Sequence, residues 1–457
     1  MRLLFACELY HPSVGGVQEV MRQIAERLVE RGHEVTVATS FLPHRKSQVV
    51  AGVSIREFRV SGNAVSGIVG EVDAYRKLVV AGDYDLLMIK AAQQWTFDAL
   101  LPVLGQITRP KVFVPCGFSG LYEPTFAGYF EKMPDALREF DRLIFYASDY
   151  RDINFARGNG LTNFEIIPNG ASEREFLAEA DPAFRRRHGI DAGDFVVLTV
   201  GSLNEFKGHR ELAEAFAEVS LPANPAVLIL NGNSPPRSSW YQAVRDFPRR
   251  LAGFYRGGGP IRVLKWILRP LVVGVGFGWL LERMGYKPPL TTLVDRINHI
   301  GGSTKHAMLV DFPRSELVQA YLNADLFVFA SRVEYSPLVL FESAAAGLPF
   351  LSVPVGNAEE IAQWTGGGRI CPALRDEMGY TQVDPTVLAD HIQALAADPD
   401  GLETMGKEGR RSWLARFTWE KIAGQYEALF ERVVAEKTLD TDTDSRPDAA
   451  LSRGAAH

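Results

Sequence analysis

Residues 2–39 read RLLFACELYHPSVGGVQEVMRQIAERLVERGHEVTVAT, and this stretch indicates the class of fold. The apolar run RLLFAC (2–7) predicts a buried β-strand, and EVTVAT (34–39) predicts a second one. Between them, a loop with two glycines leads into an amphipathic helix over about residues 17–31, which Gly32 ends. Strand, helix and strand in this order form a βαβ unit, from which parallel sheets are built.

The alternation of strand and helix patterns continues through the chain in two series. Short continuous apolar runs are typical of parallel strands that are covered on both faces. In the first series they predict strands at residues 84–90, 111–116, 142–148 and 164–170. The second series predicts strands at residues 195–201, 226–232, 307–310, 326–330 and 348–353, and helices at residues 209–219, 314–323, 337–346 and 385–397.

Two such series predict an α/β protein with two doubly wound Rossmann-like domains and an interdomain cleft at the carboxyl ends of their strands. We place the first domain at residues 1–172 and the second at residues 173–418. A final amphipathic helix at residues 419–436 would complete the first domain, and the polar residues 437–457 are predicted to be disordered. A chain of 457 residues is too long for one hydrophobic core, which agrees with two domains.

The composition excludes several classes of protein. The formal net charge of -6 argues against general nucleic-acid binding. Cys7, Cys116 and Cys371 lie far apart without any CxxC pair, so we expect no disulfide framework and no zinc site, and a reducing, cytoplasmic compartment fits. The N-terminal apolar run is too short for a signal peptide.

Residues 334–347, EYSPLVLFESAAAG, carry the strongest indication of function. Ser336 suits the N-cap of a helix, Pro337 suits its first position, and the final glycine ends the helix. The free backbone N–H groups of Leu338 and Val339 would then form a positive helix end, which favours a phosphate.

Two glutamates flank this helix end. Glu334 lies in the loop before the helix, and the side chain of Glu342, in the second turn, leans back toward the same end. An anion site between two carboxylates suits a nucleotide-sugar, with phosphates on the amides and hydroxyl groups on the acids. The alternative is one loop carboxylate and one solvated helix carboxylate without a shared ligand.

Four motifs in this order resemble the retaining glycosyltransferases of the GT-B fold, and among them the large family 4. The motifs are YHPSVGGVQEVMRQIAERLVERGHEVTVAT (10–39), IIPNGASEREF (166–176), VLTVGSLNEFKGHRELAEAF (197–216) and the Glu334–Glu342 motif followed by AAAGLPFLSVPVGNAEEI (344–361). The resemblance covers most of residues 1–435 apart from one insertion. It implies that the first domain binds an acceptor and the second a nucleotide-sugar donor.

The resemblance also implies roles for individual residues. Gly15 and Gly16 would let the backbone approach the donor diphosphate, and Lys207 would neutralise that diphosphate as it leaves. Glu342 would bind the ribose and Glu334 the sugar or the neighbouring phosphate. The predicted catalytic pair is Glu334 and Lys207, and the donor site comprises Gly15, Gly16, Ser202, Lys207, Asn231, Gly232, Glu334, Ser336, Leu338, Val339 and Glu342. Ordinary turns are the alternative for the glycines and for Asn231, and a solvated surface side chain for the lysine.

The sequence departs from the family pattern at two places. Family members usually carry an arginine where this chain has Ser202, so Arg210 or Arg332 would have to supply the second cation. Family members also often carry a histidine near the reacting sugar, at the end of a first-domain strand. This chain has Cys-Gly at that place, and the candidates on the acceptor side are therefore His11, Cys116 and Gly117.

A basic and apolar insertion interrupts the second domain at residues 235–300. Residues 235–290 contain ten lysines or arginines against two acidic residues, and Trp266 and Trp279 lie near arginines. This composition suits the interface of an anionic membrane, while the uncharged core of eleven residues, 271–281, is too short to span a bilayer. We expect a peripheral position on the inner face of the cytoplasmic membrane; a dimer contact and a buried helical subdomain are the alternatives.

No metal site and no cofactor are expected. Asp440, Asp442 and Asp444 alternate like the start of a calcium loop, but Ser445 and Leu451 stand where that loop needs glycine and glutamate. Helix amides and a lysine can stabilise a departing diphosphate without a metal ion.

Together these features predict a metal-independent hexosyltransferase of bacterial type, which moves a sugar with retention from a nucleotide-sugar such as a UDP- or GDP-sugar to a glycan or lipid-linked acceptor. A nucleotide-sugar epimerase on the same fold and a non-catalytic nucleotide-sugar-binding protein are the alternatives. A dinucleotide-dependent dehydrogenase is excluded, because no GxGxxG follows the first strand and no acidic residue ends the second.

Overall fold

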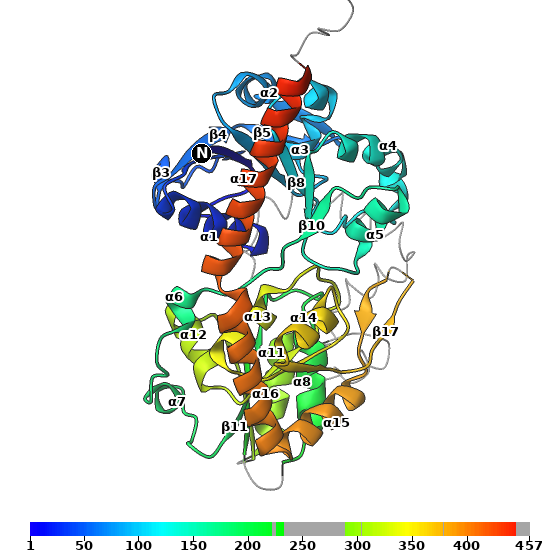
Figure 1. Cartoon of the computed structure of the whole chain (residues 1–457). Coiled ribbons are helices and arrows are strands. Elements are labelled where there is room, and N and C mark those ends of the chain that lie inside the picture. Colours follow the sequence, from blue (N-terminus) through cyan, green and yellow to red (C-terminus); the bar gives the residue numbers. More distant parts are fainter. Residues whose placement is uncertain (222–224, 233–287, 303, 378, 445–457) are drawn as a thin grey trace, which may run out of the picture. The chain divides into compact units, whose positions relative to one another are not determined.

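The computed structural model describes residues 1–221, 225–232, 288–302, 304–377 and 379–444. These residues form two compact units of mixed helices and parallel strands (Figure 1). Unit 1 comprises Met1–Asp181, Arg332–Gln382 and the chain from Pro399 onward, and unit 2 comprises Pro182–Ser331 and Val383–Asp398.

Unit 1 contains an eight-stranded sheet of order β10-β9-β8-β7-β1-β2-β4-β3, in which only β3 runs antiparallel to its neighbour. The predicted βαβ unit is confirmed, since β1 and β2 are parallel neighbours joined by helix α1. The strands are β1 (Arg2–Ala6), β2 (Glu34–Ser40), β3 (Val49–Val50), β4 (Val53–Phe58), β7 (Leu86–Lys90), β8 (Lys111–Val114), β9 (Arg142–Phe145) and β10 (Phe164–Ile166). A small antiparallel hairpin, β5 (Val60–Asn63) and β6 (Gly67–Gly70), lies outside this sheet.

Helices cover both faces of the unit 1 sheet. Leu3 and Phe5 of β1 belong to a buried core that also contains residues of the first and last helices, whereas Leu4 and Ala6 belong to the core on the other face. Successive strand residues therefore serve opposite faces, as expected for a doubly wound sheet. The helices of this region are α1 (Gly16–Glu30), α2 (Val72–Ala81), α3 (Trp95–Asp98), α4 (Ala127–Arg138), α5 (Arg151–Gly158) and α17 (Trp419–Asp444).

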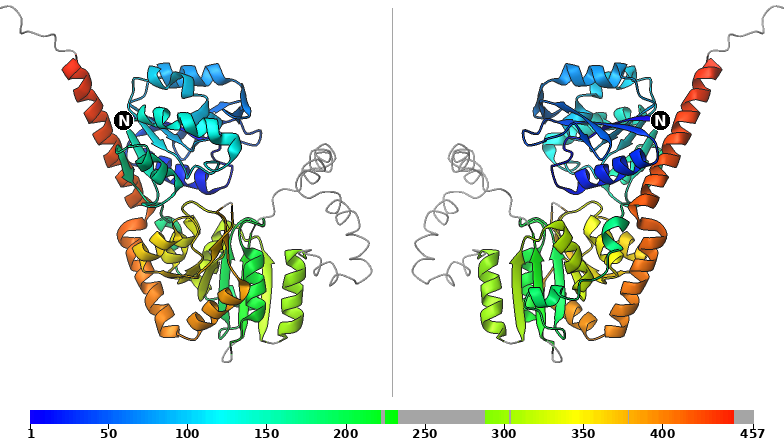
Figure 2. Two further views of the ribbon diagram at one scale, coloured as in Figure 1. Left: turned by 90° about the vertical axis from the view of Figure 1, so that its right-hand side faces the viewer. Right: turned by 90° about the vertical axis from the view of Figure 1, so that its left-hand side faces the viewer.

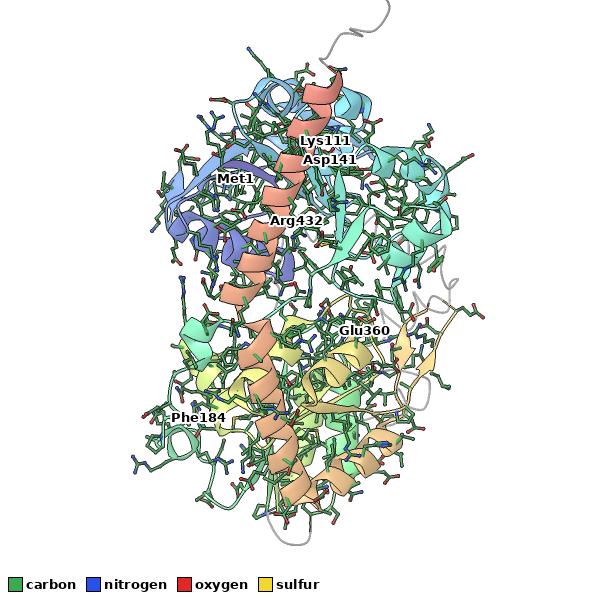
Figure 3. All side chains as sticks on the ribbon, viewed as in Figure 1. Met1, Lys111, Asp141, Phe184, Glu360 and Arg432 are labelled. Carbon is green, nitrogen blue, oxygen red and sulfur yellow. The ribbon has the colours of Figure 1, made fainter. Side chains whose placement is uncertain are left out.

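Helix α17 is longer than predicted. It continues to Asp444, so the prediction that disorder begins at residue 437 is wrong; residues 445–457 lie outside the described residues. A formed helix gains a backbone hydrogen bond with each added residue, which favours extension even through a polar sequence. Lys437 also forms an ion pair of 2.8 Å with Asp141, a residue of unit 1 that is labelled in Figure 3.

The later part of unit 1 surrounds the Glu334–Glu342 motif. Helix α16 packs against α13 and α14, and β15 and β16 are parallel neighbours. A short antiparallel hairpin, β17 and β18, follows them. The elements are α13 (Leu338–Ala346), β15 (Phe350–Ser352), α14 (Ala358–Thr365), β16 (Gly368–Ile370), β17 (Leu374–Arg375), β18 (Thr381–Gln382) and α16 (Pro399–Ser412).

Unit 2 contains most of the second predicted series, while the helix predicted at residues 337–346 and the strand predicted at residues 348–353 belong to unit 1. Its strands pair in parallel in the order β13-β12-β11-β14. Figure 2 shows α8 and α11 beside each other against these strands. The elements are β11 (Phe195–Val200), α8 (His209–Glu218), β12 (Ala226–Asn231), α11 (Leu290–Gly301), β13 (Lys305–Val310), α12 (Arg314–Asn323), β14 (Leu326–Phe329) and α15 (Pro385–Ala396). The predicted α/β class with Rossmann-like domains is confirmed.

Most of the predicted insertion lies outside the described residues, including residues 235–287 with both tryptophans. Its last part forms α11, where Leu293, Val294 and Ile297 are buried. Within the described ranges, no helix combines the length and the apolar composition that a membrane span needs.

Candidate active site

The loop before α13 carries Glu334, and three hydrogen bonds fix its backbone. The hydroxyl of Tyr150 donates to the carbonyl oxygen of Glu334 at 2.6 Å. The N–H of Asn357 donates to the next carbonyl at 2.9 Å, and the side-chain amide of Asn169 donates to the one after at 3.1 Å. Since three consecutive carbonyl groups are engaged, the side chain of Glu334 starts from a defined backbone position.

The same loop lies close to residues 355–357. Gly356 has a positive φ of 57°, and a Cβ added there would overlap the carbonyl oxygen of Tyr335. Both the backbone conformation and the close approach therefore require glycine at this position.

The ring of Tyr335 attaches the Glu334 loop to the end of β9. It stacks on Tyr146 with ring centroids 5.4 Å apart, and its hydroxyl accepts a hydrogen bond of 3.0 Å from the N–H of Tyr146. The same hydroxyl donates to the carboxylate of Asp152. Burial raises the pKa of Asp152 to about 6, although hydrogen bonds from Tyr335 and from the N–H of Gly117 oppose this rise.

The predicted acceptor-side residues separate into two groups. Gly117 lies beside the Glu334 loop, since a Cβ added to it would be 3.0 Å from Cγ of Tyr335. Its neighbour Cys116 has a positive φ of 62°, and burial raises the pKa of its thiol to about 11, so it is not a thiolate at neutral pH. His11 is exposed, and its carbonyl oxygen accepts a hydrogen bond of 2.8 Å from Arg45. A role of these residues toward an acceptor stays a prediction.

A buried lysine, Lys90, lies near the thiol of Cys116. The ammonium of Lys90 donates to the hydroxyl of Tyr146 at 2.5 Å. Burial lowers the pKa of Lys90 to about 8, while the nearby thiols of Cys116 and Cys7 act in the opposite direction. This contact supports Tyr146, on which the ring of Tyr335 stacks.

Helix α13 begins one residue later than predicted. It starts at Leu338, and Pro337 occupies the N-cap position with a ψ of 116°, so the prediction that Ser336 caps the helix is wrong. The carbonyl of Ser336 is bound by Asn169, and the extended Pro337 that follows delays the first helical turn. As predicted, Leu338 and Val339 lie in the first turn, where backbone N–H groups have no partner within the helix.

Two further predictions about α13 are confirmed. Gly347 ends the helix in the left-handed conformation with a φ of 72°. Glu342 lies in the second turn and is buried, with an exposed fraction of 9%. A carboxylate in this position would face a low-dielectric environment, where it interacts strongly with a hydroxyl group or a cation.

In unit 2, the loop between β11 and α8 carries Lys207. Gly208 follows it with a positive φ of 71°, and a Cβ added there would overlap the carbonyl oxygen of Ala330. The hydroxyl of Ser331 donates to the carbonyl of Phe206 at 3.0 Å. The lysine loop is therefore fixed against the end of β14.

The ends of β11 and β12 bring several predicted residues together. The N–H of Gly201, next to Ser202, donates to the carbonyl of Asn231 at 3.1 Å. A Cβ added to Gly201 would be 3.3 Å from Cβ of Lys207, and one added to Gly232 would overlap the carbonyl of Gly201. The side chain of Asn231 accepts the N–H of Phe312 at 2.9 Å, so this asparagine serves the loop after β13.

The two candidate replacement cations are already engaged. Arg210 donates to the carbonyl of Pro288 and contacts Glu214 at 3.5 Å. Arg332 forms an ion pair of 3.3 Å with Asp376. That Arg210 or Arg332 supplies the cation in place of the arginine missing at residue 202 stays a prediction.

The glycines before α1 differ in their surroundings. Gly15 has an extended backbone, and a Cβ added to it would contact the side chain of Gln18. A Cβ added to Gly16 would meet no atom within 4 Å, so the space beside this first residue of α1 is open. Lys207 belongs to unit 2 and these glycines, like Glu334, belong to unit 1, so their action on one donor stays a prediction.

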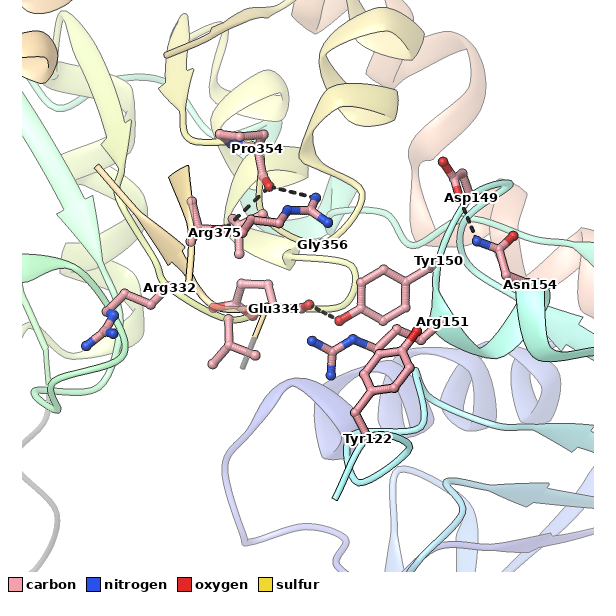
Figure 4. A pocket seen from close by; sticks show the side chains of 14 residues that line it. Tyr122, Asp149, Tyr150, Arg151, Asn154, Arg332, Glu334, Pro354, Gly356 and Arg375 are labelled. Carbon is pink, nitrogen blue, oxygen red and sulfur yellow. Dashed lines mark hydrogen bonds between the residues drawn. The ribbon is translucent and has the colours of Figure 1, made fainter. Parts of the chain in front are cut away.

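Sequence reasoning missed a pocket of about 230 Å³ beside Glu334 (Figure 4). Tyr150 and Arg151 line it from the start of α5, and Arg375 lines it from β17. No local motif marks these residues, because they come from segments about two hundred residues apart in the sequence. Among the described residues, no group of three or more histidine, cysteine or acidic side chains is arranged to bind a metal ion.

Two family models match this chain. Residues 14–173 match the model described as Glycosyltransferase Family 4, and residues 271–412 match the model described as Glycosyl transferases group 1. N-acetyl-alpha-D-glucosaminyl L-malate synthase from Bacillus anthracis is 22% identical over 448 residues, which cover 93% of this chain and 96% of that protein.

Two solved structures share the fold. Sucrose-phosphate synthase from Thermosynechococcus elongatus has a TM-score of 0.65 and 19% identity, covering 95% of this chain and 99% of that chain. Anabaena Alr3699/HepE in complex with UDP has a TM-score of 0.64 and 17% identity, covering 94% of this chain and 100% of that chain.

Proposed function

Because the chain belongs to the glycosyltransferases of the GT-B fold, we propose that it transfers a sugar from a nucleotide-sugar to an acceptor hydroxyl, with retention of configuration and without a metal ion. The observation that carries this proposal is the fixed loop before α13, where three consecutive carbonyl groups are engaged and Glu334 precedes a helix N-terminus.

In the proposed reaction, the bond between the anomeric carbon and the phosphate oxygen breaks, and the electron pair stays on the phosphate. The acceptor oxygen bonds to the anomeric carbon on the same face, and its proton passes to the leaving phosphate oxygen. No group is oxidised or reduced. A separate protein base is unnecessary, so the protein's task is to stabilise the charges that develop.

The residues of the two units would divide this task. The N–H groups of Leu338 and Val339, at the positive end of α13, and the ammonium of Lys207 would stabilise the departing diphosphate. Glu334 would bind the sugar near its developing positive charge, and Glu342 would bind the ribose hydroxyl groups. These contacts need no metal ion. We therefore expect sugar transfer to continue in the presence of a chelator.

We propose a UDP-sugar as the first donor to test, because a solved structure with the same fold was obtained in complex with UDP. The acceptor is proposed to be a glycan or a lipid-linked molecule. The sequence of residues 235–290, which is basic and rich in apolar residues, supports a peripheral position at the inner face of the cytoplasmic membrane. Fractionation at low salt without detergent tests this position, and a fully soluble protein would contradict it.

The activity itself is tested by incubating the protein with UDP-sugars and a membrane extract from the source cells as acceptor. We expect release of UDP that requires both the donor and the extract, and a product with the anomeric configuration of the donor by NMR. An epimerase would rearrange the donor without the extract, and a binding protein would release no UDP. An inverted product would contradict the retaining mechanism.

A further inference from the structure

The pocket beside Glu334 lies entirely within unit 1. One wall comes from the segment after β9, with Tyr150 and Arg151 (Figure 4). The opposite wall comes from the loop at residues 354–356 and from the β17–β18 hairpin, which carries Arg375. Glu334 lies between the walls, so a molecule in this pocket would lie next to the proposed sugar-binding carboxylate.

The lining of this pocket contains charged side chains of both signs. It contains three arginines and two carboxylates, those of Asp149 and Glu334. Arg332 is paired with Asp376 at 3.3 Å, which is not part of the lining. Asp149 accepts a hydrogen bond of 2.7 Å from Asn154, another lining residue. The other two arginines of the lining have no such acidic partner at ion-pair distance among the described residues.

These two arginines are Arg151 and Arg375. The guanidinium of Arg151 lies 5.2 Å from the ring centroid of Tyr122, and that of Arg375 donates to the carbonyl of Pro354 at 3.4 Å. Within the part of the chain that the structure describes, neither forms an ion pair with a carboxylate. Each guanidinium has five N–H donors, and these contacts leave most of them open.

The two arginines face the same space. A Cβ added to Gly379, in the hairpin that carries Arg375, would be 3.3 Å from Nη2 of Arg151. Both guanidinium groups also act electrostatically on the hydroxyl of Tyr150, and both favour its ionised form. The carboxylate of Glu334 in the same lining offsets part of the repulsion between the two guanidinium groups, and a bound anion would offset more of it. The planar N–H pairs of the two guanidinium groups match a carboxylate or a phosphate.

We propose that Arg151 and Arg375 bind an anionic group, a phosphate or a carboxylate, of the acceptor substrate. This inference rests on the proposed glycosyltransferase function, because only then does a molecule next to Glu334 receive a sugar. In the proposed function, the N–H groups at the start of α13 and the ammonium of Lys207 would bind the donor diphosphate. Part of the pocket wall comes from the first 172 residues, which the resemblance assigns to the acceptor.

The test measures binding of inorganic phosphate and of succinate to the full-length protein by calorimetry, with and without saturating UDP at constant ionic strength. We expect both anions to bind in either condition. Arg151→Gln and Arg375→Gln should each weaken binding about tenfold, as expected for the loss of one charge-assisted contact. Arg375→Lys should weaken it less, because it keeps the charge and loses the planar pair of donors.

The matched control is Arg369→Gln, which removes an exposed arginine of β16 that does not line the pocket. It should leave anion binding unchanged, and circular dichroism should show that all variants are folded. Anion binding that is absent in the wild type, or equal in all variants, would overturn the proposal.

A UDP titration of the same variants separates the two possible sources of the anion. Unchanged UDP affinity in the arginine variants supports binding of an acceptor group. If UDP displaced the anions and the arginine variants lost UDP affinity to the same degree, the pocket would serve the donor and the proposal would be wrong. Failure of the wild type to bind any nucleotide would contradict the proposed function, whereas the anion titration would still decide what the pocket binds.

Discussion

The hydroxyl of Tyr150 lies 2.6 Å from the backbone carbonyl oxygen of Glu334 and donates a hydrogen bond to it. Tyr150 follows β9 and Glu334 follows β14, so this bond joins segments that are 184 residues apart in sequence. The position of the proposed sugar-binding carboxylate therefore depends on the end of a strand in the unit 1 sheet.

Replacing Tyr150 with phenylalanine should loosen the Glu334 loop without unfolding the protein. We expect kcat/KM for sugar transfer to fall about fivefold, because a single hydrogen bond contributes about 1 kcal/mol. The free energy of unfolding, measured in urea, should fall by about 1 kcal/mol or less. Tyr122→Phe is the matched control, since it keeps the exposed ring beside Arg151, and it should leave both quantities unchanged.

The two glutamates of the α13 motif should have separable effects. Glu334→Gln should lower kcat about 100-fold with little change in UDP affinity, because its charge acts mainly on the sugar in the transition state. Glu342→Gln should weaken UDP binding about tenfold, because it removes the proposed contact to the ribose. Steady-state kinetics and calorimetry measure the two effects.

Glu359→Gln, at an exposed position of α14, is the control for both glutamate variants. It should behave like the wild type in both measurements. Equal kinetics for Glu334→Gln and this control would show that the motif does not act as proposed.

Gly208→Ala should destabilise unit 2 and displace Lys207. The new Cβ would overlap the carbonyl oxygen of Ala330, and the positive φ of 71° is unfavourable for alanine. We expect a loss of about 2 kcal/mol or more in the free energy of unfolding, together with weaker UDP binding. At Gly193, an added Cβ would meet no atom within 4 Å, so Gly193→Ala should be nearly neutral. A neutral Gly208→Ala would show that the loop does not need this close approach.

The carboxyl group of Asp152 should make stability depend on pH. Burial raises its pKa in the folded protein from 3.8 to about 6. Between these values the folded state binds more protons than the unfolded state, so the free energy of unfolding should fall as the pH rises from about 4 to about 6. The total change is about 3 kcal/mol at most, and the contribution is constant above this window.

Urea unfolding between pH 4 and pH 7 measures this dependence. The stability of the wild type minus that of Asp152→Asn should decrease with rising pH and become constant above about pH 6.5. Asp149→Asn changes an exposed neighbour and serves as the control. If the wild type and Asp152→Asn gave parallel profiles, the buried carboxyl would not titrate in this range.

Local patterns were sufficient to predict the parallel strands and most of the helices of unit 2. The helix predicted at residues 314–323 is observed as Arg314–Asn323, and its buried residues Leu317, Val318, Ala320 and Tyr321 show the spacing of one helix face. Strand β4 escaped prediction because its buried residues alternate with exposed ones, unlike the continuous apolar runs of the inner strands. Beyond residue 436, α17 carries the contact between Lys437 and Asp141, which no local pattern reveals.

The candidate site was only partly predictable for the same reason. Glu334 and Glu342 lie in one continuous stretch, so helix signals placed both of them near the start of α13. Tyr150 and Asp152 support that stretch from far away in the sequence, and their role follows only from the fold. Just before α13, the distant side chain of Asn169 binds the carbonyl of Ser336, a contact that no local pattern reveals either.

The most direct test of the account is a titration of the full-length protein with UDP-sugars, GDP-sugars and ADP-sugars in the presence of EDTA, read as a shift in Tm. We expect one class of nucleotide-sugar to raise Tm equally with and without EDTA, in line with a stabilisation of about 2.7 kcal/mol at a hundredfold excess over Kd. Lys207→Ala should reduce the shift. No shift with any nucleotide-sugar, or a shift that EDTA abolishes, would contradict a metal-independent nucleotide-sugar site.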